Sequence, residues 1–294
     1  MSTMLLIIFL FFSFFFLGAP SASAHEAYVL PHDFFWQGIM RAASWTHTFD
    51  AFTDPHNIFL TIIIGGAIAS LILINFFFRR SRFGNRAHSR FERLARYGSH
   101  SVRIAVAVVL FFSAQSNTFL GPELYGSSFS HPLLVKILLY VLSGMIVLGL
   151  LTELAAVVAI MLYCYSVYVF GSYMFAYANY LGEFLVLLLF GMRVFSVDTY
   201  IFGPLKKFQA FQKYESVIVR VMYGAGLIFA AVTVKLMHPE LTIAVVNTWH
   251  LTQFHFLFPG DPRLVTFGAG IVELVVGLFI IFGFESNNFS RNRE

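Results

Sequence analysis

The chain has 294 residues, of which 58% are hydrophobic and 12% are charged, and its mean hydropathy is +0.76. A soluble domain carries about twice that fraction of charge, so the composition excludes an ordinary soluble protein. The net charge of +4 does not indicate nucleic-acid binding, because the basic residues are sorted along the chain. The single cysteine, Cys164, excludes a disulfide, an iron–sulfur cluster and a cysteine-rich zinc site. Its apolar surroundings predict a small buried side chain.

The first 56 residues read as a leader followed by an external segment. Residues 1–24 have an apolar core of about a dozen residues, then Gly-Ala-Pro and Ala-Ser-Ala, the pattern of a signal peptide with its cleavage site. No Lys or Arg precedes this core, so an uncleaved signal anchor is the alternative. Either form places residues 25–56 outside the cytoplasm, where their Trp and Phe residues favour the membrane interface.

Beyond this segment, apolar stretches of membrane-spanning length alternate with polar ones. Basic residues set the orientation: residues 79–103 hold eight arginines and one acid, and fifteen of the nineteen Lys and Arg residues fall on the side of this loop. We therefore expect an all-α, polytopic bundle integral to the cytoplasmic (inner) membrane, with the mature N-terminus outside, the lipid bilayer as partner and no nucleic acid. The predicted spans are about 57–78, 102–120, 133–151, 154–174, 178–196, 218–237 and 264–284. A long loop that starts at His238 joins the last two, and the stretch with Tyr173, Tyr177 and Tyr180 indicates an aromatic belt.

Two stretches look like copies of one another. Residues 103–122 read RIAVAVVLFFSAQSNTFLGP and residues 220–239 read RVMYGAGLIFAAVTVKLMHP, so each has a proline nineteen residues after an arginine. A helix of this length measures about 28 Å, close to the thickness of a hydrocarbon core. The repetition predicts a membrane protein built from repeats.

The later copy and the last span carry a recognisable set of residues. Gly224 and Gly226 follow the arginine, then come Lys235 and His238, and the last span reads FGAGIVELVVGLFIIFG with Glu273 inside it. These residues resemble the DoxX family. The earlier half, which closes in FGMRVFSVDTYIFG, resembles the same family through Arg103, His131, Pro132, Ser143, Gly144, Gly149, Gly191, Ser196 and Asp198.

The resemblance covers residues 100–284 and suggests a division of the chain. Residues 100–200 form a DoxX-like four-helix unit, 201–217 a cytoplasmic linker, and 218–294 a partial second unit with the tail; residues 57–99 precede them as the first span and the Arg-rich loop. Tyr140 stands in the first unit where the second has Glu273. The second unit stops after two helices, so self-association or a redox partner protein is expected to complete it.

The resemblance implies a four-helix membrane bundle associated with quinone-linked redox chemistry. The related DoxD protein is a subunit of a thiosulfate:quinone oxidoreductase, and DoxX proteins are linked to oxidative-stress complexes. A subunit or accessory of a membrane redox system is therefore expected, whereas a reaction catalysed by the chain itself is not specified. Quinone is the cofactor that this reading favours.

Glu273 is the sharpest candidate, because it lies about 15 Å into the last span, where an ionisable group is costly. Three roles are open: a protonated acid, a partner for Lys235, or an acceptor of a proton from a quinol. A neutral packing glutamate, aided by Gly270 and Gly277, is the alternative. For Lys235, whose stem can snorkel to the outer boundary, the alternative is a simple surface cation.

Glu183 is the third catalytic candidate after Glu273 and Lys235. It lies in the fifth predicted span, where a proton relay and a hydrogen-bonded interfacial carboxylate are both open. Arg220 and His238 join Glu273 and Lys235 as the expected quinone-binding set. Gln115 and Asn117, in the second predicted span, are expected to hydrogen-bond between helices, as the default role for such residues.

Several histidines gather on the outer side, and imidazole suits copper or zinc. Their spacing matches no strong metal motif, so scattered surface histidines are the alternative. Two further functions therefore stay open beside the redox one: an outer metal-binding or scaffolding protein, and a small-solute transporter suggested by the repeats. The candidate metal ligands are His25, which would begin the chain after cleavage, and His131, His238, His250 and His255.

Overall fold

A computed structural model describes about two thirds of the chain. The described residues are 30–41, 98–190, 196–202, 214–253 and 260–282, with helical residues scattered between 58 and 77. Several predictions lie outside them: the leader 1–24, His25, most of the Arg-rich loop, Gly191, most of the linker, His255 and the tail from 283 onward.

The described part of the chain is helical except for one short β-ribbon, which confirms the all-α prediction at this level. The ribbon pairs β1 (Thr118–Phe119) with β2 (Gly121–Tyr125) in antiparallel register. A 3₁₀ turn, η2 (Gly171–Tyr177), and a π-helical turn, η4 (Ala231–Met237), interrupt the α-helices. The α-helices are α3 (His32–Ile39), α7 (Gly98–Ser116), α8 (Pro132–Leu148), α9 (Thr152–Phe170), α10 (Ala178–Phe190), α11 (Val197–Phe202), α12 (Glu215–Ala230), α13 (Pro239–Thr248) and α14 (Pro262–Phe282).

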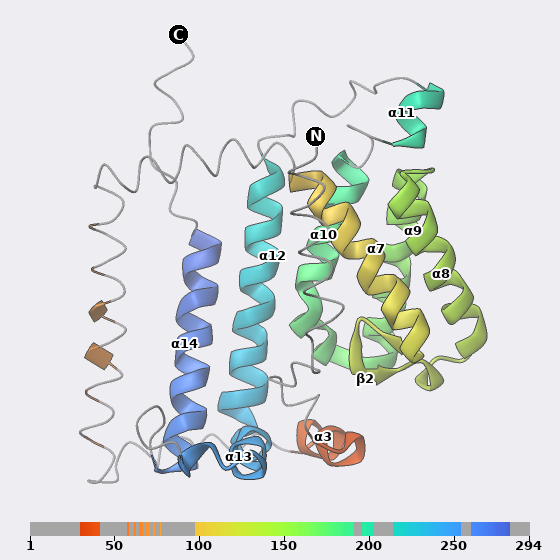
Figure 1. Cartoon of the computed structure of the whole chain (residues 1–294). Helices are drawn as coiled ribbons and strands as arrows, with labels where there is room; N and C mark the ends of the chain where they lie inside the picture. The colour runs from red at the N-terminus through yellow and green to blue at the C-terminus, as the bar shows by residue number, and fades with distance from the viewer. Residues whose placement is uncertain are drawn as a thin grey trace.

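The long helices stand side by side and the short elements close their ends (Figure 1). Helices α12 and α14 pack together, α10 packs on α12, and α7, α8 and α9 complete the group beyond α10. We call the two ends of this bundle the α11 end and the α13 end. At the α13 end lie α3, the β-ribbon, η2 and α13, with α13 running crosswise under α12 and α14 (Figure 1).

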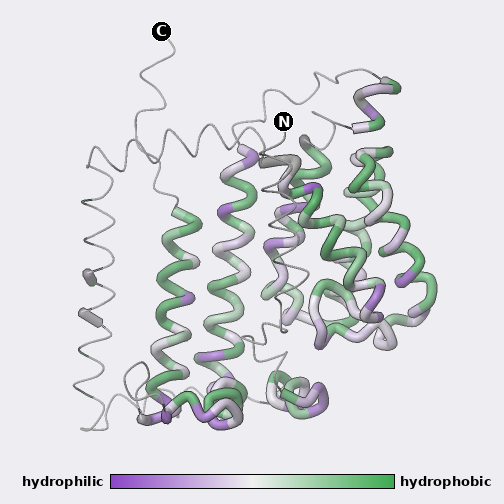
Figure 2. The backbone as a smooth tube through the Cα atoms, viewed as in Figure 1, coloured by the Kyte–Doolittle hydropathy of each residue, from purple (hydrophilic) through white to green (hydrophobic). Residues whose placement is uncertain are grey.

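Three helical stretches are long and apolar enough, by length and composition, to cross a membrane: Thr152–Leu189, Glu215–Met237 and Pro262–Phe282. Figure 2 shows the largely apolar colouring of α14 and the mixed colouring of α3 and α13. The first stretch has 38 residues, and as one straight helix it would measure about 57 Å, too long for a single crossing. It folds instead at Gly171, whose φ of 67° is left-handed, into the neighbouring helices α9 and α10. Ser101–Ser116 and Pro132–Leu148 are shorter apolar helices.

The second predicted span ends earlier than expected. Helix α7 stops at Ser116, and Asn117 and Leu120 then adopt left-handed φ values of 55° and 62°, a conformation that asparagine tolerates well. The backbone N–H of Leu120 donates to Ser113 Oγ (3.1 Å), which holds the turn into the ribbon. Pro122 therefore lies in β2, whereas Pro239 opens α13, so the two predicted copies end in different structures.

Two other local predictions were wrong. Cys164 is exposed on the surface of α9 rather than buried, because its neighbours Tyr163 and Ser166 take the inward face. The segment after His238, expected as a long loop, begins with helix α13. Its buried Leu241 and Val245, four residues apart, give it an apolar face against the bundle.

Glycines bring α12 and α14 into close contact. A Cβ at Gly224 would lie 2.5 Å from the carbonyl oxygen of Gly277, and a Cβ at Gly277 would lie 2.9 Å from the carbonyl oxygen of Gly224. Small residues at facing positions let helix backbones approach, as they do in membrane bundles. The packing role expected for Gly277 is confirmed.

Asp198 stabilises the α11 end of the bundle through hydrogen bonds. Its carboxylate accepts hydrogen bonds from the backbone N–H of Leu151 (2.7 Å) and of Thr152 (2.9 Å) and from the Thr152 hydroxyl (3.2 Å). Helix α9 has no capping side chain of its own, since Leu151 is at its N-cap in a left-handed conformation. Asp198 thus caps α9 from 46 residues further along the chain.

Candidate functional site

The structure brings Glu273 and Lys235 together between α14 and α12. Lys235 Nζ lies 3.0 Å from Glu273 Oε2, an ion pair in which the lysine side chain is 7% exposed and the glutamate side chain 34% exposed. The pairing that the sequence left open is therefore the one the structure has. The lysine is the buried member of the pair, and removing the partner of a buried charge costs on the order of 3 to 5 kcal/mol.

Lys235 occupies the π-helical turn η4, which continues α12 without a break. A π-turn inserts an extra residue into the helical ladder and is frequently found at functional sites. The turn ends at Met237, and His238 and Pro239 then redirect the chain into α13. The lysine is thus placed at a defined irregularity of an otherwise regular apolar helix.

Gly270 allows α14 to approach this turn. A Cβ added at Gly270 would lie 3.2 Å from Lys235 Cβ and 3.0 Å from Leu236 Cδ2. Glu273 follows one helical turn later on α14 and so reaches the lysine at the same contact. The glycine, the lysine and the glutamate therefore form one unit, and the packing role expected for Gly270 is confirmed.

His238 lies at the same end but is engaged by the backbone. Its ring nitrogen Nδ1 is 2.7 Å from the carbonyl oxygen of Thr233, and Nε2 is 3.1 Å from that of Arg41. The residue is 4% exposed. These contacts tie the segment after α3 to the end of α12, and a ligand could use either nitrogen only by breaking one of them.

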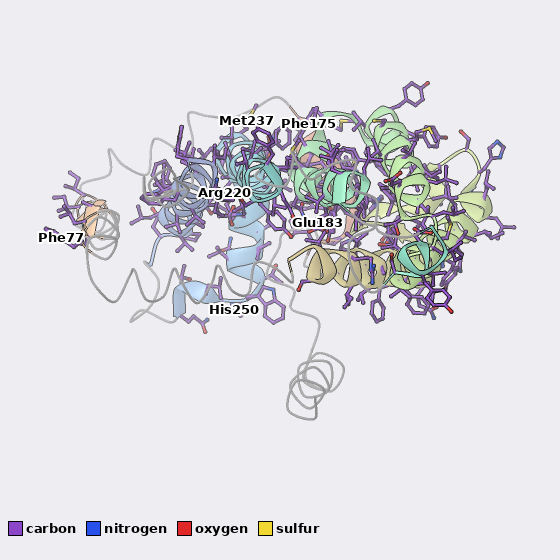
Figure 3. All side chains as sticks on the ribbon, turned by 90° about the horizontal axis from the view of Figure 1, so that it is seen from above. Phe77, Phe175, Glu183, Arg220, Met237 and His250 are labelled. Carbon is purple, nitrogen blue, oxygen red and sulfur yellow. The ribbon has the colours of Figure 1, made fainter. Side chains whose placement is uncertain are left out.

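Arg220 is not brought to this site. It lies fifteen residues before Lys235 on the same helix, a separation of about 22 Å along the axis. Figure 3 looks along the helix axes and labels Arg220 on α12 and Glu183 on the neighbouring α10. The expected quinone-binding set thus divides into a pair with His238 nearby at the α13 end, and Arg220 nearer the α11 end.

Glu183 forms a second polar site, between α10 and α12. The Tyr223 hydroxyl donates to Glu183 Oε1 at 2.5 Å, and the Asn179 side chain contacts the same hydroxyl. Glu183 is 5% exposed, and within the described residues its Oε2 has no hydrogen-bond partner. Both roles expected for this carboxylate, relay and hydrogen-bonded packing group, are compatible with this geometry.

The described histidines do not converge. His131 is exposed at an apolar groove between α8 and α9 of about 300 Å³, His238 is buried, and His250 is exposed with a left-handed φ of 50°. Within the described residues, no three His, Cys, Asp or Glu side chains gather closely enough to hold a metal ion. Of the two predicted interhelical residues, Gln115 accepts a hydrogen bond from Tyr140 of α8 (2.8 Å), whereas Asn117 lies beyond the end of α7.

The sequence did not point to one buried acid that the structure shows. Glu123 is 2% exposed and accepts hydrogen bonds from Tyr173 and Tyr177, which the sequence assigned only to an aromatic belt. An acid between Gly121-Pro122 and a hydrophobic residue gives no periodic signal. The tyrosine-rich run at 173–180 was the one available clue, since clustered hydroxyls require partners when they are buried.

The described residues form a bundle of apolar helices with an ion pair between two of them and three buried carboxylates, Glu123, Glu183 and Asp198. Comparison of the chain with protein-family models, curated proteins and solved structures finds no match.

Proposed function

We propose that the protein is a DoxX-like integral membrane subunit or accessory of a quinone-linked redox system, in which Lys235 and Glu273 bind the quinone headgroup. The ion pair between two helices that are long and apolar enough to cross a membrane is the observation that carries this proposal. An ionisable pair on membrane-spanning helices is costly and marks a functional site by default.

The exposure of the pair supports a ligand that arrives from the lipid. Lys235 is buried against α14, whereas a third of the Glu273 side chain is open on the surface of an apolar helix. A lipid-soluble molecule with a polar head can reach such a carboxylate without crossing a charged surface. Its apolar tail would remain among the apolar side chains beside α14, several of which are exposed.

The two side chains suit a quinone headgroup chemically. A quinone supplies two-electron redox chemistry, and its reduced form carries hydroxyl groups that release protons on oxidation. The Lys235 ammonium can donate a hydrogen bond to a carbonyl oxygen, and the Glu273 carboxylate can accept a hydroxyl proton. The chain would then bind and orient the headgroup and take up one of the two protons, while the second proton passes to water and the two electrons pass to a redox partner.

The proposal includes the topology expected from the sequence: about seven spans in the inner membrane with the α13 end outside. In the described residues, α7, α9 and α12 begin at the α11 end, and α8, α10 and α14 begin at the α13 end (Figure 1). This alternation is what consecutive spans require. With the α13 end outside, Lys235 would lie near the outer side and Glu273 near the middle of α14.

The test is quinone binding to the purified protein in lipid nanodiscs. We expect Glu273→Gln to weaken binding about tenfold or more, because a charge-assisted contact is lost. Glu153→Gln, the same substitution at a partly exposed acid on α9, serves as the control and should bind normally. Unchanged quinone binding and quinone-linked activity in folded Glu273→Gln protein would refute the proposal.

A further inference from the structure

The buried Glu123 side chain connects two tyrosine hydroxyls. Its Oε1 accepts hydrogen bonds from Tyr173 (2.8 Å) and from Tyr177 (2.5 Å). The Tyr173 contact has the ordinary length of an O–H···O hydrogen bond, and the Tyr177 contact is shorter. Its other oxygen, Oε2, is buried and has no hydrogen-bond partner within the described residues. This carboxylate is therefore held in the protein with only half of its hydrogen-bonding capacity used.

Three distant parts of the chain build this site. Glu123 lies on β2, the tyrosines lie on η2, and α3 covers them, with His32 Nε2 and Trp36 Nε1 each 3.2 Å from the Glu123 carbonyl oxygen. A Cβ at position 121 would lie 2.0 Å from the Tyr177 hydroxyl oxygen, so the absence of a side chain at Gly121 leaves room for this hydroxyl. The position of the Tyr177 hydroxyl is thus limited by the backbone at Gly121, and the aromatic residues of α3 pack over the tyrosines.

The tyrosines also belong to a continuous row of oxidisable rings. The ring centroids of Trp36 and Tyr173 are 5.3 Å apart, those of Tyr173 and Tyr177 are 6.2 Å apart, and those of Tyr177 and Tyr180 are 6.1 Å apart. All three separations are those of rings in contact. The row leads from the partly exposed Trp36 of α3 to Tyr180 in the first turn of α10.

We propose that Tyr173 and Tyr177, with Glu123 as proton acceptor, form a one-electron relay between Trp36 and Tyr180. A one-electron oxidant, such as an organic radical or an oxidised metal complex, takes an electron from the Tyr177 ring. The phenolic O–H bond breaks, the proton forms an O–H bond with Glu123 Oε1, and a neutral phenoxyl radical and a neutral carboxylic acid remain. A one-electron donor of the thiol or hydroquinone class returns the electron, and the proton returns to the phenolate oxygen.

The burial of Glu123 favours this transfer. Oxidising a phenol without a nearby base leaves a strongly acidic cation radical, whereas here the proton already lies in a hydrogen bond to a carboxylate. A buried carboxylate that lacks partners for one oxygen is poorly stabilised as an ion, and accepting the proton makes it neutral. The relay uses neither Lys235 nor Glu273, so it stands independently of the quinone site.

The test is photochemical oxidation of the full-length protein in nanodiscs by a flash-generated ruthenium(III) polypyridyl complex. Transient absorption and electron paramagnetic resonance measure the rate and yield of tyrosyl radical. We expect Glu123→Gln and the double variant Tyr173→Phe/Tyr177→Phe to lower the rate about tenfold or more. Tyr168→Phe and Tyr200→Phe, at tyrosines that are 86% and 94% exposed, serve as controls and should leave the Glu123-dependent phase unchanged.

The glutamine variant separates the relay from a purely structural role. Its amide oxygen can still accept the tyrosine hydrogen bonds, but it is too weak a base to take the proton. A folded Glu123→Gln protein with the wild-type rate would overturn the proposal, as would a radical confined to exposed tyrosines. If the variants fail to fold, the wild type decides: the rate should fall in D₂O because the transferred proton is replaced by deuterium, and equal rates in H₂O and D₂O would reject the relay.

Discussion

The α12–α14 contact and the α3–β2–η2 contact stabilise their carboxylates in different ways. Glu273 has a cation 3.0 Å away and remains a third exposed. Glu123 is 2% exposed and has only neutral hydroxyl donors on one of its oxygens. The first carboxylate is neutralised by its partner and open to ligands, which suits binding. The second is enclosed and accepts from hydroxyl donors on one oxygen, which suits accepting a proton.

The largest expected effect comes from breaking the ion pair on one side. Glu273→Gln leaves the Lys235 ammonium buried without its carboxylate and should lower the free energy of unfolding by about 3 kcal/mol. Unfolding in mixed detergent micelles measures it. The double variant Lys235→Met/Glu273→Gln should recover most of the loss, because no unpaired charge remains. A double variant as unstable as the single one would show that the two residues are not coupled.

Removal of the other carboxylate should cost less. Glu123→Ala leaves the hydroxyls of Tyr173 and Tyr177 without their acceptor in a buried site, and we expect a loss of about 2 kcal/mol in the free energy of unfolding. Tyr177→Phe removes one donor and should cost about 1 kcal/mol. If Glu123→Ala leaves the free energy of unfolding unchanged while Glu273→Gln lowers it, the hydrogen bonds from the tyrosines to Glu123 do not stabilise the fold.

Glycine substitutions distinguish the two contacts sterically. Gly121→Ala places a methyl group 2.0 Å from the Tyr177 hydroxyl oxygen and must displace it, whereas Gly270→Ala meets the end of the Leu236 side chain at 3.0 Å and Lys235 Cβ at 3.2 Å. We expect a cost of about 2 kcal/mol at Gly121 and less than about 1 kcal/mol at Gly270. Gly121→Ala should also lower the flash-induced tyrosyl radical yield, which Gly270→Ala should leave unchanged. Equal effects of both substitutions on that yield would contradict the assignment.

The sequence singled out both residues of the first contact, and offered their pairing as one of three roles for Glu273, because the signal of each residue is local. Glu273 and Lys235 each interrupt an apolar helix, and Gly270 and Gly277 repeat on one face of α14, so depth and spacing alone point to them. Glu123 and Tyr173 lie 50 residues apart and meet only because the chain turns at Asn117 into a ribbon. Asp198 caps α9 across a similar distance. Contacts of this kind depend on tertiary packing, which no periodicity in the sequence records.

The smallest expected effect is at a second ion pair, which tests whether burial gives the Lys235–Glu273 contact its strength. Arg263 Nη2 lies 2.8 Å from Asp261 Oδ2 at the start of α14, but the arginine side chain is 42% exposed. Asp261→Asn should lower the free energy of unfolding by about 0.5 kcal/mol, and raised salt should reduce this difference further. The Lys235–Glu273 coupling should change little with salt, because its lysine is shielded from solvent. Equal coupling energies and equal salt dependence of the two pairs would show that burial does not strengthen the Lys235–Glu273 pair. The energetic argument for a binding site at the α12–α14 contact would then fail.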